Sequence, residues 1–191
     1  MSRAVFLDRD GVLNVPMIRD GLPYPPQSIE EFRLYPEAPE ACALLRQAGF
    51  RLVVVTNQPD VGRGTQSLDV VEKMHARLTE KIPIDRIEIC TAANDQAPDA
   101  ARRKPAPGML LDAARALGLD LARSYLIGDR WRDIDCGHAA GCITIFIERN
   151  YAEKLHERPH HYAADLLDAA RLILSLEQPQ PAPLAHASHL P

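Results

Sequence analysis

The sequence alternates short apolar segments with longer amphipathic ones, and this alternation limits the possible folds more than any other feature. The apolar runs are continuous, as in Leu52 to Val55 and Ile143 to Ile147, which is typical of strands that are covered on both faces. Strands of this kind that alternate with helices form a parallel sheet between two layers of helices. The pattern therefore predicts a three-layer α/β domain.

The boundaries of the expected elements follow from the same pattern. Strands are predicted at Ala4–Leu7, Arg51–Val55, Ile87–Cys90, Ser124–Ile127 and Cys142–Ile147. Helices are predicted at about Glu37–Ala48, Leu68–Lys81, Pro107–Leu117, Trp131–Ala140 and Ala163–Leu176. Ser67 and Asp129 stand where helix N-caps belong, and Gly49 and Gly118 stand where helices end.

Length and composition favour one domain. The chain has 191 residues, which corresponds to about one domain, and we expect residues 1–178 to form it. Residues 179–191 contain four prolines and little to bury, which predicts a disordered tail. The net charge of −4 argues against a nucleic-acid or anionic-membrane partner, because both require a basic face.

The sequence also indicates a compartment. No apolar run approaches the roughly 18 residues that span a bilayer, and no signal-peptide core precedes the first acidic residue. The four cysteines form no CxxC pair and are expected to be reduced, buried hydrophobes. We therefore expect a soluble cytoplasmic protein, and a monomer.

One connection is much longer than the others. Nearly thirty residues, Arg9 to Pro36, lie between the first strand and the first helix, and they are rich in proline. Long connections in compact domains are usually functional lids or disordered segments. Because this connection leaves the end of the first strand directly, we expect a flap over a binding site.

Polar side chains stand at the ends of the predicted strands and at one helix start. They occur in four groups: Asp8-Arg9-Asp10, Thr56-Asn57-Gln58, Arg102-Arg103-Lys104 and Asp129 to Asp133. Ligands bind at the carboxyl ends of the strands in open parallel sheets, near the point where the strand order reverses. The sequence therefore predicts that the four groups converge on one site.

The pair Asp8 and Asp10 has more than one reading when taken alone. Two residues apart on an extended segment, the carboxylates project to the same side, but such strings are also common in solvated turns. A calcium-binding EF-hand loop is excluded, because its sixth and twelfth positions are Leu13 and Arg19 here. The chain also lacks the glycine-rich phosphate-binding loops GxxxxGK[ST] and GxGxxG.

Several carboxylates in one crevice repel each other unless a hard cation lies among them. Asp129 and Asp133 alone could simply favour a helix N-terminus, but the sheet brings Asp129 to the same end as Asp8. Oxygen ligands of this kind suit Mg²⁺, which readily takes substrate phosphate as a further ligand. Thr56 and Lys104 would then contact the phosphoryl oxygens.

Four motifs together resemble a known superfamily. The segments DRDGVLN, VVVTNQ, RRKPAPGML and IGDRWRDID are similar, in order and spacing, to the motifs of the haloacid dehalogenase (HAD) phosphohydrolases. Within that superfamily the chain resembles the capless histidinol-phosphatase/heptose-bisphosphate-phosphatase branch, over about residues 4–147. The resemblance implies a Rossmann-like HAD core without a cap domain, whose site is covered only by the flap.

The resemblance also implies roles for the residues in these motifs. Asp8 would attack phosphorus and form an aspartyl-phosphate, while Asp10 would act as the general acid and base. Mg²⁺ would be held by the Asp8 side chain, the Asp10 main-chain carbonyl and Asp129, and Thr56 and Lys104 would stabilise the phosphoryl group. Asp133 would orient Lys104 or a metal-bound water. The residues implied in substrate recognition are Asn57, Gln58, Arg103, Arg130 and the flap around Met17 to Asp20.

The chain departs from the pattern of that branch in one loop. Many members carry a zinc site built from Cys-x-His and Cys-x-Cys shortly before the Arg-Lys motif. Only Cys90 remains here, and one ligand cannot form a four-coordinate structural site. We therefore expect Mg²⁺ as the cofactor and no zinc.

The expected activity is the hydrolysis of a small phosphorylated metabolite. The resemblance implies a heptose 1,7-bisphosphate that loses its 7-phosphate, with histidinol phosphate or another sugar phosphate as the alternative. A nucleic acid with a 3′-phosphate is disfavoured by the acidic charge, and a metal-dependent glycosyltransferase by the lack of a nucleotide signature. A non-catalytic phosphometabolite-binding domain is disfavoured by the intact pair Asp8 and Asp10.

Overall fold

The computed structural model describes residues 1–178, and the segment 179–191, for which a disordered tail was predicted, lies outside the described residues. A six-stranded parallel sheet with the strand order β5-β4-β1-β6-β7-β8 forms the centre of the fold. Its strands are β1 (Ala4–Leu7), β4 (Arg51–Asn57), β5 (Arg86–Cys90), β6 (Tyr125–Gly128), β7 (Ile143–Ile147) and β8 (His161–Ala163). The predicted α/β class with a parallel sheet is confirmed.

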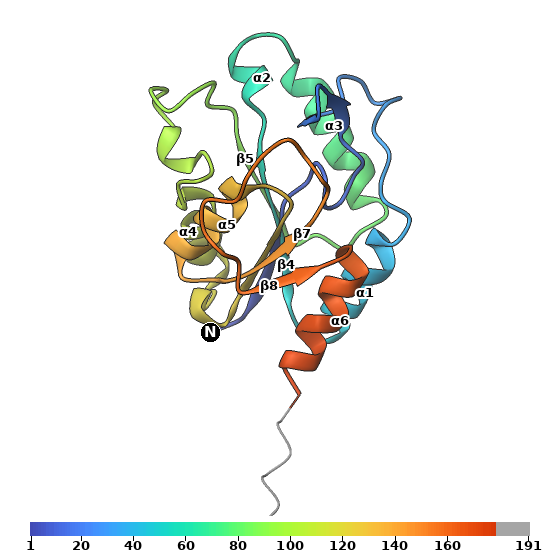
Figure 1. Ribbon diagram of the computed structural model, residues 1–191, viewed down its shortest axis with the longest axis vertical. Coiled ribbons are helices and arrows are strands. Elements are labelled where there is room, and N and C mark those ends of the chain that lie inside the picture. Colours follow the sequence, from blue (N-terminus) through green and yellow to red (C-terminus); the bar gives the residue numbers. More distant parts are fainter. Residues whose placement is uncertain (179–191) are drawn as a thin grey trace, which may run out of the picture.

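Helices cover both faces of this sheet (Figure 1). They are α1 (Ala38–Gln47), α2 (Pro59–Gly62), α3 (Leu68–Thr79), α4 (Gly108–Leu117), α5 (Trp131–Ala140) and α6 (Leu166–Leu176), with short 3-10 turns at Ala100–Arg102 and Leu121–Arg123. The helices α1, α3 and α6 lie on one side of the sheet and α4 and α5 on the other. These are the three layers that the sequence predicts.

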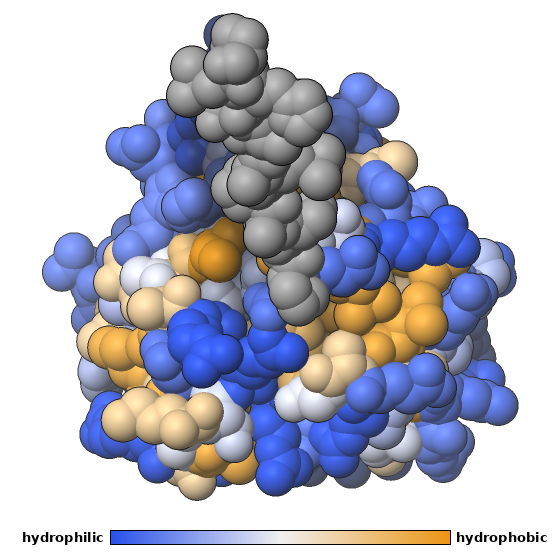
Figure 2. Space-filling model, turned by 90° about the horizontal axis from the view of Figure 1, so that it is seen from below, coloured by the Kyte–Doolittle hydropathy of each residue, from blue (hydrophilic) through white to orange (hydrophobic). Residues whose placement is uncertain are grey.

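The side chains of each central strand alternate between two apolar cores. Val5 and Leu7 of β1 pack with α1, α3 and α6, whereas Ala4 and Phe6 pack with α4 and α5. All four are fully buried. This explains why the strand sequences are continuously apolar, because neither face of the sheet meets water. At the end of the molecule seen from below in Figure 2, hydrophilic side chains separate smaller apolar patches.

The long connection after β1 does form a separate substructure. It contains an antiparallel hairpin of β2 (Met17–Arg19) and β3 (Leu22–Tyr24). A tight loop precedes this hairpin, in which the backbone N–H groups of Leu13 and Asn14 both donate to the carbonyl of Arg9, at 2.9 and 3.0 Å. This loop turns the chain sharply after β1 and fixes the positions of Asp8 and Asp10.

Two local predictions are wrong. The predicted helix Ala163–Leu176 begins only at Leu166, since residues 161–163 pair with β7 as a sixth strand. Asp129 is not a helix N-cap, because α5 is capped by Arg130, whose backbone N–H donates to Asp133 at 3.1 Å. The side chain of Asp129 instead faces the end of β1.

Candidate active site

Lys104 forms buried ion pairs at the carboxyl ends of the central strands. Its ammonium lies 2.6 Å from a carboxylate oxygen of Asp8 and 2.6 Å from one of Asp133, and it donates to the carbonyl of Val55 at 2.9 Å. Burial lowers the pKa of Lys104, but the charges of Asp133 and Asp8 outweigh it and raise the pKa above its ordinary value. Lys104 is therefore a permanently charged group, and Asp133 holds it by an ion pair.

Asp8 has an unusual protonation equilibrium for a carboxylate that is paired with lysine. Burial, together with the negative charges of Asp133 and Asp10, raises its pKa to about 6 against the opposing effect of Lys104. One ammonium thus cannot compensate the acidic groups that gather at this point. A further cation would favour the ionised form.

The side chain of Asp10 is held by three donors on the flap side of β1. Arg9, which is fully buried, donates from its Nη2 atom to both carboxylate oxygens at 3.0 and 2.8 Å. The amides of Asn14 and Gln58 donate to the same carboxylate at 3.0 and 2.9 Å. These bonds hold the Asp10 side chain beside Asp8, and Asp10 still lines the cavity.

Thr56, Asn57 and Gln58, at the end of β4, make different contacts. Thr56 lines the cavity, and its hydroxyl accepts a bond from Gln58 at 2.9 Å. The side chain of Asn57 bonds both the backbone N–H and the carbonyl of Lys104, each at 3.0 Å. Gln58 is buried behind the cavity, where it orients Asp10 and Thr56. Of the two residues expected to contact substrate, only Asn57 therefore reaches the cavity wall.

A group of carboxylates fits a hard cation. One oxygen each of Asp8, Asp129 and Asp133 lies within 4.8 Å of the others, and all three residues are buried. Burial, followed by the charges of Asp8 and Asp133, raises the pKa of Asp129 well above its ordinary value. The Oδ1 atom of Asp129 is buried without a hydrogen-bond partner. A buried carboxylate oxygen left free in an anionic cluster suits Mg²⁺, whose preferred ligands are oxygens.

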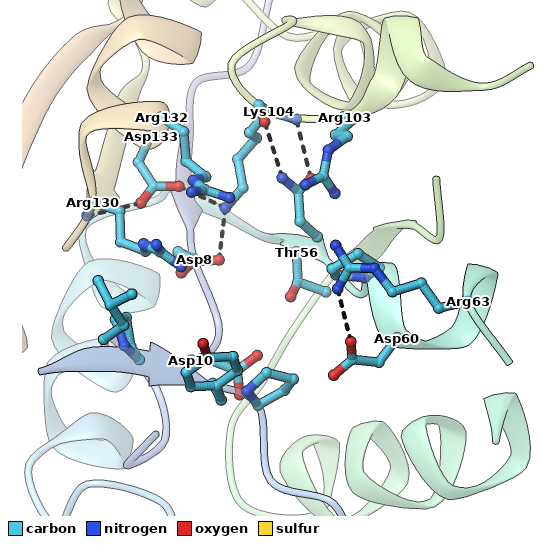
Figure 3. A pocket seen from close by; sticks show the side chains of 16 residues that line it. Asp8, Asp10, Thr56, Asp60, Arg63, Arg103, Lys104, Arg130, Arg132 and Asp133 are labelled. Atoms are coloured by element: carbon cyan, nitrogen blue, oxygen red, sulfur yellow. Dashed lines mark hydrogen bonds and ion pairs between the residues drawn. The ribbon is translucent and has the colours of Figure 1, made fainter. Parts of the chain in front are cut away.

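A cavity of about 280 Å³ lies against Asp8 and Asp133 of this cluster (Figure 3). Five cationic side chains line it: Arg63, Arg103, Lys104, Arg130 and Arg132. The carboxylates on its wall are Asp8, Asp10, Asp60 and Asp133. Lys104 is paired with two of these acids, Asp8 and Asp133. The cationic side chains in the outer part of the cavity are therefore all arginines. The arrangement suits a ligand with more than one anionic group.

The arginines are held from outside the cavity. Arg103 donates to the carbonyl of Ala92 at 3.0 Å, and Arg130 donates from its Nε atom to Glu153 at 2.7 Å. Arg132 shares the same Glu153 at 3.6 Å, and its Nε atom is buried without a partner. Two guanidinium groups thus share one carboxylate. The sequence motifs indicated Arg103 and Arg130 but not Arg132.

The flap contributes residues other than those expected. Leu22, Pro23, Tyr24 and Pro25 line the cavity, whereas Met17 to Asp20, which were expected to contact substrate, do not. The reason is the hairpin, whose second strand faces the site and whose first strand lies outside, with Ile18 55% exposed. Arg63 and Asp60, paired at 3.0 Å on the opposite rim, were also not predicted.

All four cysteines are buried and free, as expected. Among the helices of residues 1–178, none is long and apolar enough to span a membrane.

Comparisons with known proteins identify the family of this chain. The HAD-hydrolase-like family matches residues 101–169. D-glycero-D-manno-heptose-1,7-bisphosphate 7-phosphatase of Chlorobaculum tepidum is 36% identical over 188 residues, covering 88% of this chain and 92% of the relative. D-glycero-beta-D-manno-heptose-1,7-bisphosphate 7-phosphatase of Pseudomonas aeruginosa is 36% identical over 154 residues, covering 78% of this chain and 83% of the relative. The crystal structure of D,D-heptose 1,7-bisphosphate phosphatase from B. bronchiseptica, complexed with magnesium and phosphate, has a TM-score of 0.77 at 29% identity, covering 91% of this chain and 99% of that one.

The fold and the site together define a phosphoric monoester hydrolase of the HAD superfamily. Three of its motifs lie at the ends of the adjacent parallel strands β4, β1 and β6, and the fourth, which contains Lys104, precedes α4. The chain belongs to the HAD family that contains these heptose-bisphosphate phosphatases.

Proposed function

We propose that this chain removes the 7-phosphate from D-glycero-D-manno-heptose 1,7-bisphosphate in a Mg²⁺-dependent reaction, and that residues 1–178 form the single catalytic domain. The observation that carries the proposal is the cavity wall itself. It places Asp8, Asp10, Thr56 and Lys104 together at the bottom and arginines at the outer end. Relatives that this chain matches over most of their length are named for this reaction.

Asp8 is the nucleophile in this proposal. One of its carboxylate oxygens attacks phosphorus, the bond between phosphorus and the sugar oxygen breaks, and an aspartyl-phosphate forms. Asp10 gives its proton to the departing sugar oxygen and then takes a proton from the water that hydrolyses the acyl phosphate. The bonds from Arg9, Asn14 and Gln58 keep the Asp10 carboxyl next to Asp8 through both steps.

Mg²⁺ would be held by Asp8, Asp129 and the main-chain carbonyl of Asp10. When bound there, the ion neutralises charge on the transferred phosphoryl group. In the complex, the Lys104 ammonium would exchange its bond to Asp8 for one to a phosphoryl oxygen, while Asp133 and the carbonyl of Val55 hold it in place. The hydroxyl of Thr56 would donate to the same phosphoryl group. Pre-oriented donors of this kind stabilise the transition state without a cost of reorganisation.

The outer arginines bind the rest of the substrate. Arg103 and Arg130 reach the cavity from opposite sides, and Arg132 adds a guanidinium whose charge is only partly compensated. The incompletely paired guanidinium of Arg132 favours a bisphosphate over a monophosphate. It is the reason to prefer the heptose bisphosphate over histidinol phosphate.

The test is phosphate release in the presence of Mg²⁺. The heptose 1,7-bisphosphate anomers, sugar monophosphates and histidinol phosphate are compared by kcat/KM, and phosphorus NMR identifies which phosphate is lost. We expect the bisphosphate to be preferred and the 7-phosphate to be removed. A higher kcat/KM for histidinol phosphate or another monophosphate would overturn the assignment of the heptose bisphosphate as the substrate.

Variants test the mechanism separately. Asp10→Asn should lower kcat by about 10²–10⁴-fold, the usual range for general acid–base catalysis. Asp69→Asn, the same change at an exposed position of α3, is the matched control. Near-normal turnover of Asp10→Asn would contradict its assignment as the acid and base.

We also infer that the chain is monomeric, cytoplasmic and free of zinc. Cys90 supports the last point, because its thiol is buried near Asp99 and burial raises its pKa, which disfavours the thiolate that zinc requires. Elemental analysis of the purified protein and light scattering after size exclusion test the metal content and the oligomeric state. Stoichiometric zinc or a stable dimer would refute the corresponding inference.

A further inference from the structure

The connection between β7 and β8 contacts several parts of the site that are distant in sequence (orange in Figure 1). Within its residues 148–153, Arg149 donates to the carbonyl of Gly11 at 2.9 Å, and the backbone N–H of Ala152 donates to the carbonyl of Gly21 at 2.8 Å. Glu153 pairs with the cavity arginines. This segment therefore touches both the loop after β1 and the flap hairpin.

Tyr151, at the centre of this segment, bonds a carboxylate of the acidic cluster. Its hydroxyl donates to the Oδ2 atom of Asp129 at 2.8 Å. The other oxygen of Asp129, Oδ1, is buried and has no partner. The two oxygens of one carboxylate are thus distinguished, since one is occupied by a neutral donor and the other remains free.

The backbone at Gly11 limits the space around the same oxygen atom of Asp129. A Cβ atom at Gly11 would lie 1.7 Å from Oδ2 of Asp129 and 2.9 Å from the hydroxyl of Tyr151. Gly11 also has a φ of +104°, which L side chains rarely adopt. The carboxylate of Asp129 therefore lies against both Gly11 and the hydroxyl of Tyr151, and its rotation is restricted.

The tyrosine remains a donor under ordinary conditions. A phenol has an ordinary pKa of about 10, so it is protonated and donates a hydrogen bond at neutral pH. A neutral donor stabilises the charged carboxylate without adding a positive charge that would compete with a metal ion. A lysine or arginine at this position would repel the cation.

We propose that Tyr151 is a positioning residue for the Mg²⁺ site, which holds Asp129 by Oδ2 so that Oδ1 is presented to the cation. The proposal rests on the proposed Mg²⁺-dependent function but requires no particular substrate. Bonds to the outer side of metal-binding side chains typically contribute 10–100-fold to metal affinity. The loss of this one hydroxyl is therefore expected to weaken Mg²⁺ binding by a factor in that range.

The experiment is a titration of the full chain with Mg²⁺ by calorimetry, without substrate, for the wild type and Tyr151→Phe. We expect Kd for Mg²⁺ to rise by about 10–100-fold. In phosphatase assays the Mg²⁺ concentration for half-maximal rate should rise by the same factor, with kcat at saturating Mg²⁺ much less affected. Tyr162→Phe removes a hydroxyl from a ring 53% exposed on β8 and should bind Mg²⁺ as the wild type does.

A second readout uses the wild-type protein alone. Because Tyr151 bonds Asp129, a proposed Mg²⁺ ligand, adding Mg²⁺ should change the absorption of tyrosine in the near ultraviolet. The midpoint of this change should coincide with the midpoint of the calorimetric titration. Unchanged Mg²⁺ affinity in Tyr151→Phe, an equal loss in Tyr162→Phe, or no tyrosine signal in the wild type would overturn the proposal. Mg²⁺ binding with no heptose-bisphosphate hydrolysis would refute only the proposed substrate.

Discussion

His75 on α3 should make the stability of this protein depend on pH. Its Nε2 atom lies 3.2 Å from Nη1 of Arg9, the buried guanidinium that bonds Asp10. Burial and then the charge of Arg9 lower the pKa of His75 from 6.5 to about 4. The neutral ring accepts a bond from Arg9, whereas a protonated ring would face another donor with the same charge.

The size of the effect follows from the two pKa values. Below pH 6.5 the unfolded chain binds a proton at His75 that the folded protein does not take up until about pH 4. The folded state therefore loses stability as the pH falls through this interval. Each pKa unit corresponds to about 1.36 kcal/mol, so the full difference is about 3 kcal/mol, and we expect about 2 kcal/mol because the ring is partly exposed. For a domain of this size that lowers Tm by about 4–8 °C.

The assay is urea unfolding of the metal-free wild type and of His75→Gln at several pH values between 7 and 4. Glutamine can still accept a bond from Arg9 but does not titrate. The difference in the free energy of unfolding between the two proteins should therefore shift by about 2 kcal/mol across the interval, in favour of the variant at low pH. His161→Gln, which removes a histidine from β8, is the control. A difference that stays constant with pH would refute the reasoning.

Three further predictions concern the site. Asp8→Asn should abolish turnover. It should leave Tm unchanged or raised, because burial already disfavours the charged carboxylate of Asp8. Measurable phosphate release or a large fall in Tm would contradict this prediction. Gly11→Ala should lower the free energy of unfolding by about 2–4 kcal/mol and weaken Mg²⁺ binding, because the added Cβ would overlap Asp129. Wild-type stability in urea unfolding together with wild-type Mg²⁺ affinity would count against this prediction. Arg132→Gln should lower kcat/KM about tenfold for the bisphosphate but little for a monophosphate, and equal losses for both would disprove a contact with the second phosphate.

The fold was predictable because its determinants are local. Strands buried on both faces must be continuously apolar, and the segments Ala4–Leu7 and Ile143–Ile147 carry that signal along their whole length. The strand β8 lacks it, since its three residues include the exposed Tyr162 and only the buried Ala163 faces the core. A short edge strand is determined by its pairing with β7, which a local pattern does not reveal.

The centre of the site was predictable for a related reason. Parallel strands end at one edge, so Asp8, Thr56 and Asp129 were expected to be neighbours from their positions alone. Tyr151 was not predicted, because it belongs to a loop and meets Asp129 only through the path of the chain after β7. The geometry of loops depends on tertiary contacts, such as the bond between Arg149 and Gly11, that have no periodic signature in the sequence.

The charge balance of the site connects its stability with its activity. Removing one partner of a buried ion pair is strongly destabilising, yet the buried carboxylates of Asp8, Asp129 and Asp133 share a single ammonium from Lys104. Asp133 is satisfied by that ammonium and Asp129 in part by the neutral Tyr151, so the uncompensated charge lies between Asp8 and the free oxygen of Asp129. A divalent cation at this point would restore the balance and, by the same charge, keep Asp8 ionised for attack. In the proposed mechanism, the repulsion among these clustered carboxylates is therefore what would make the ionisation of Asp8 depend on the metal ion.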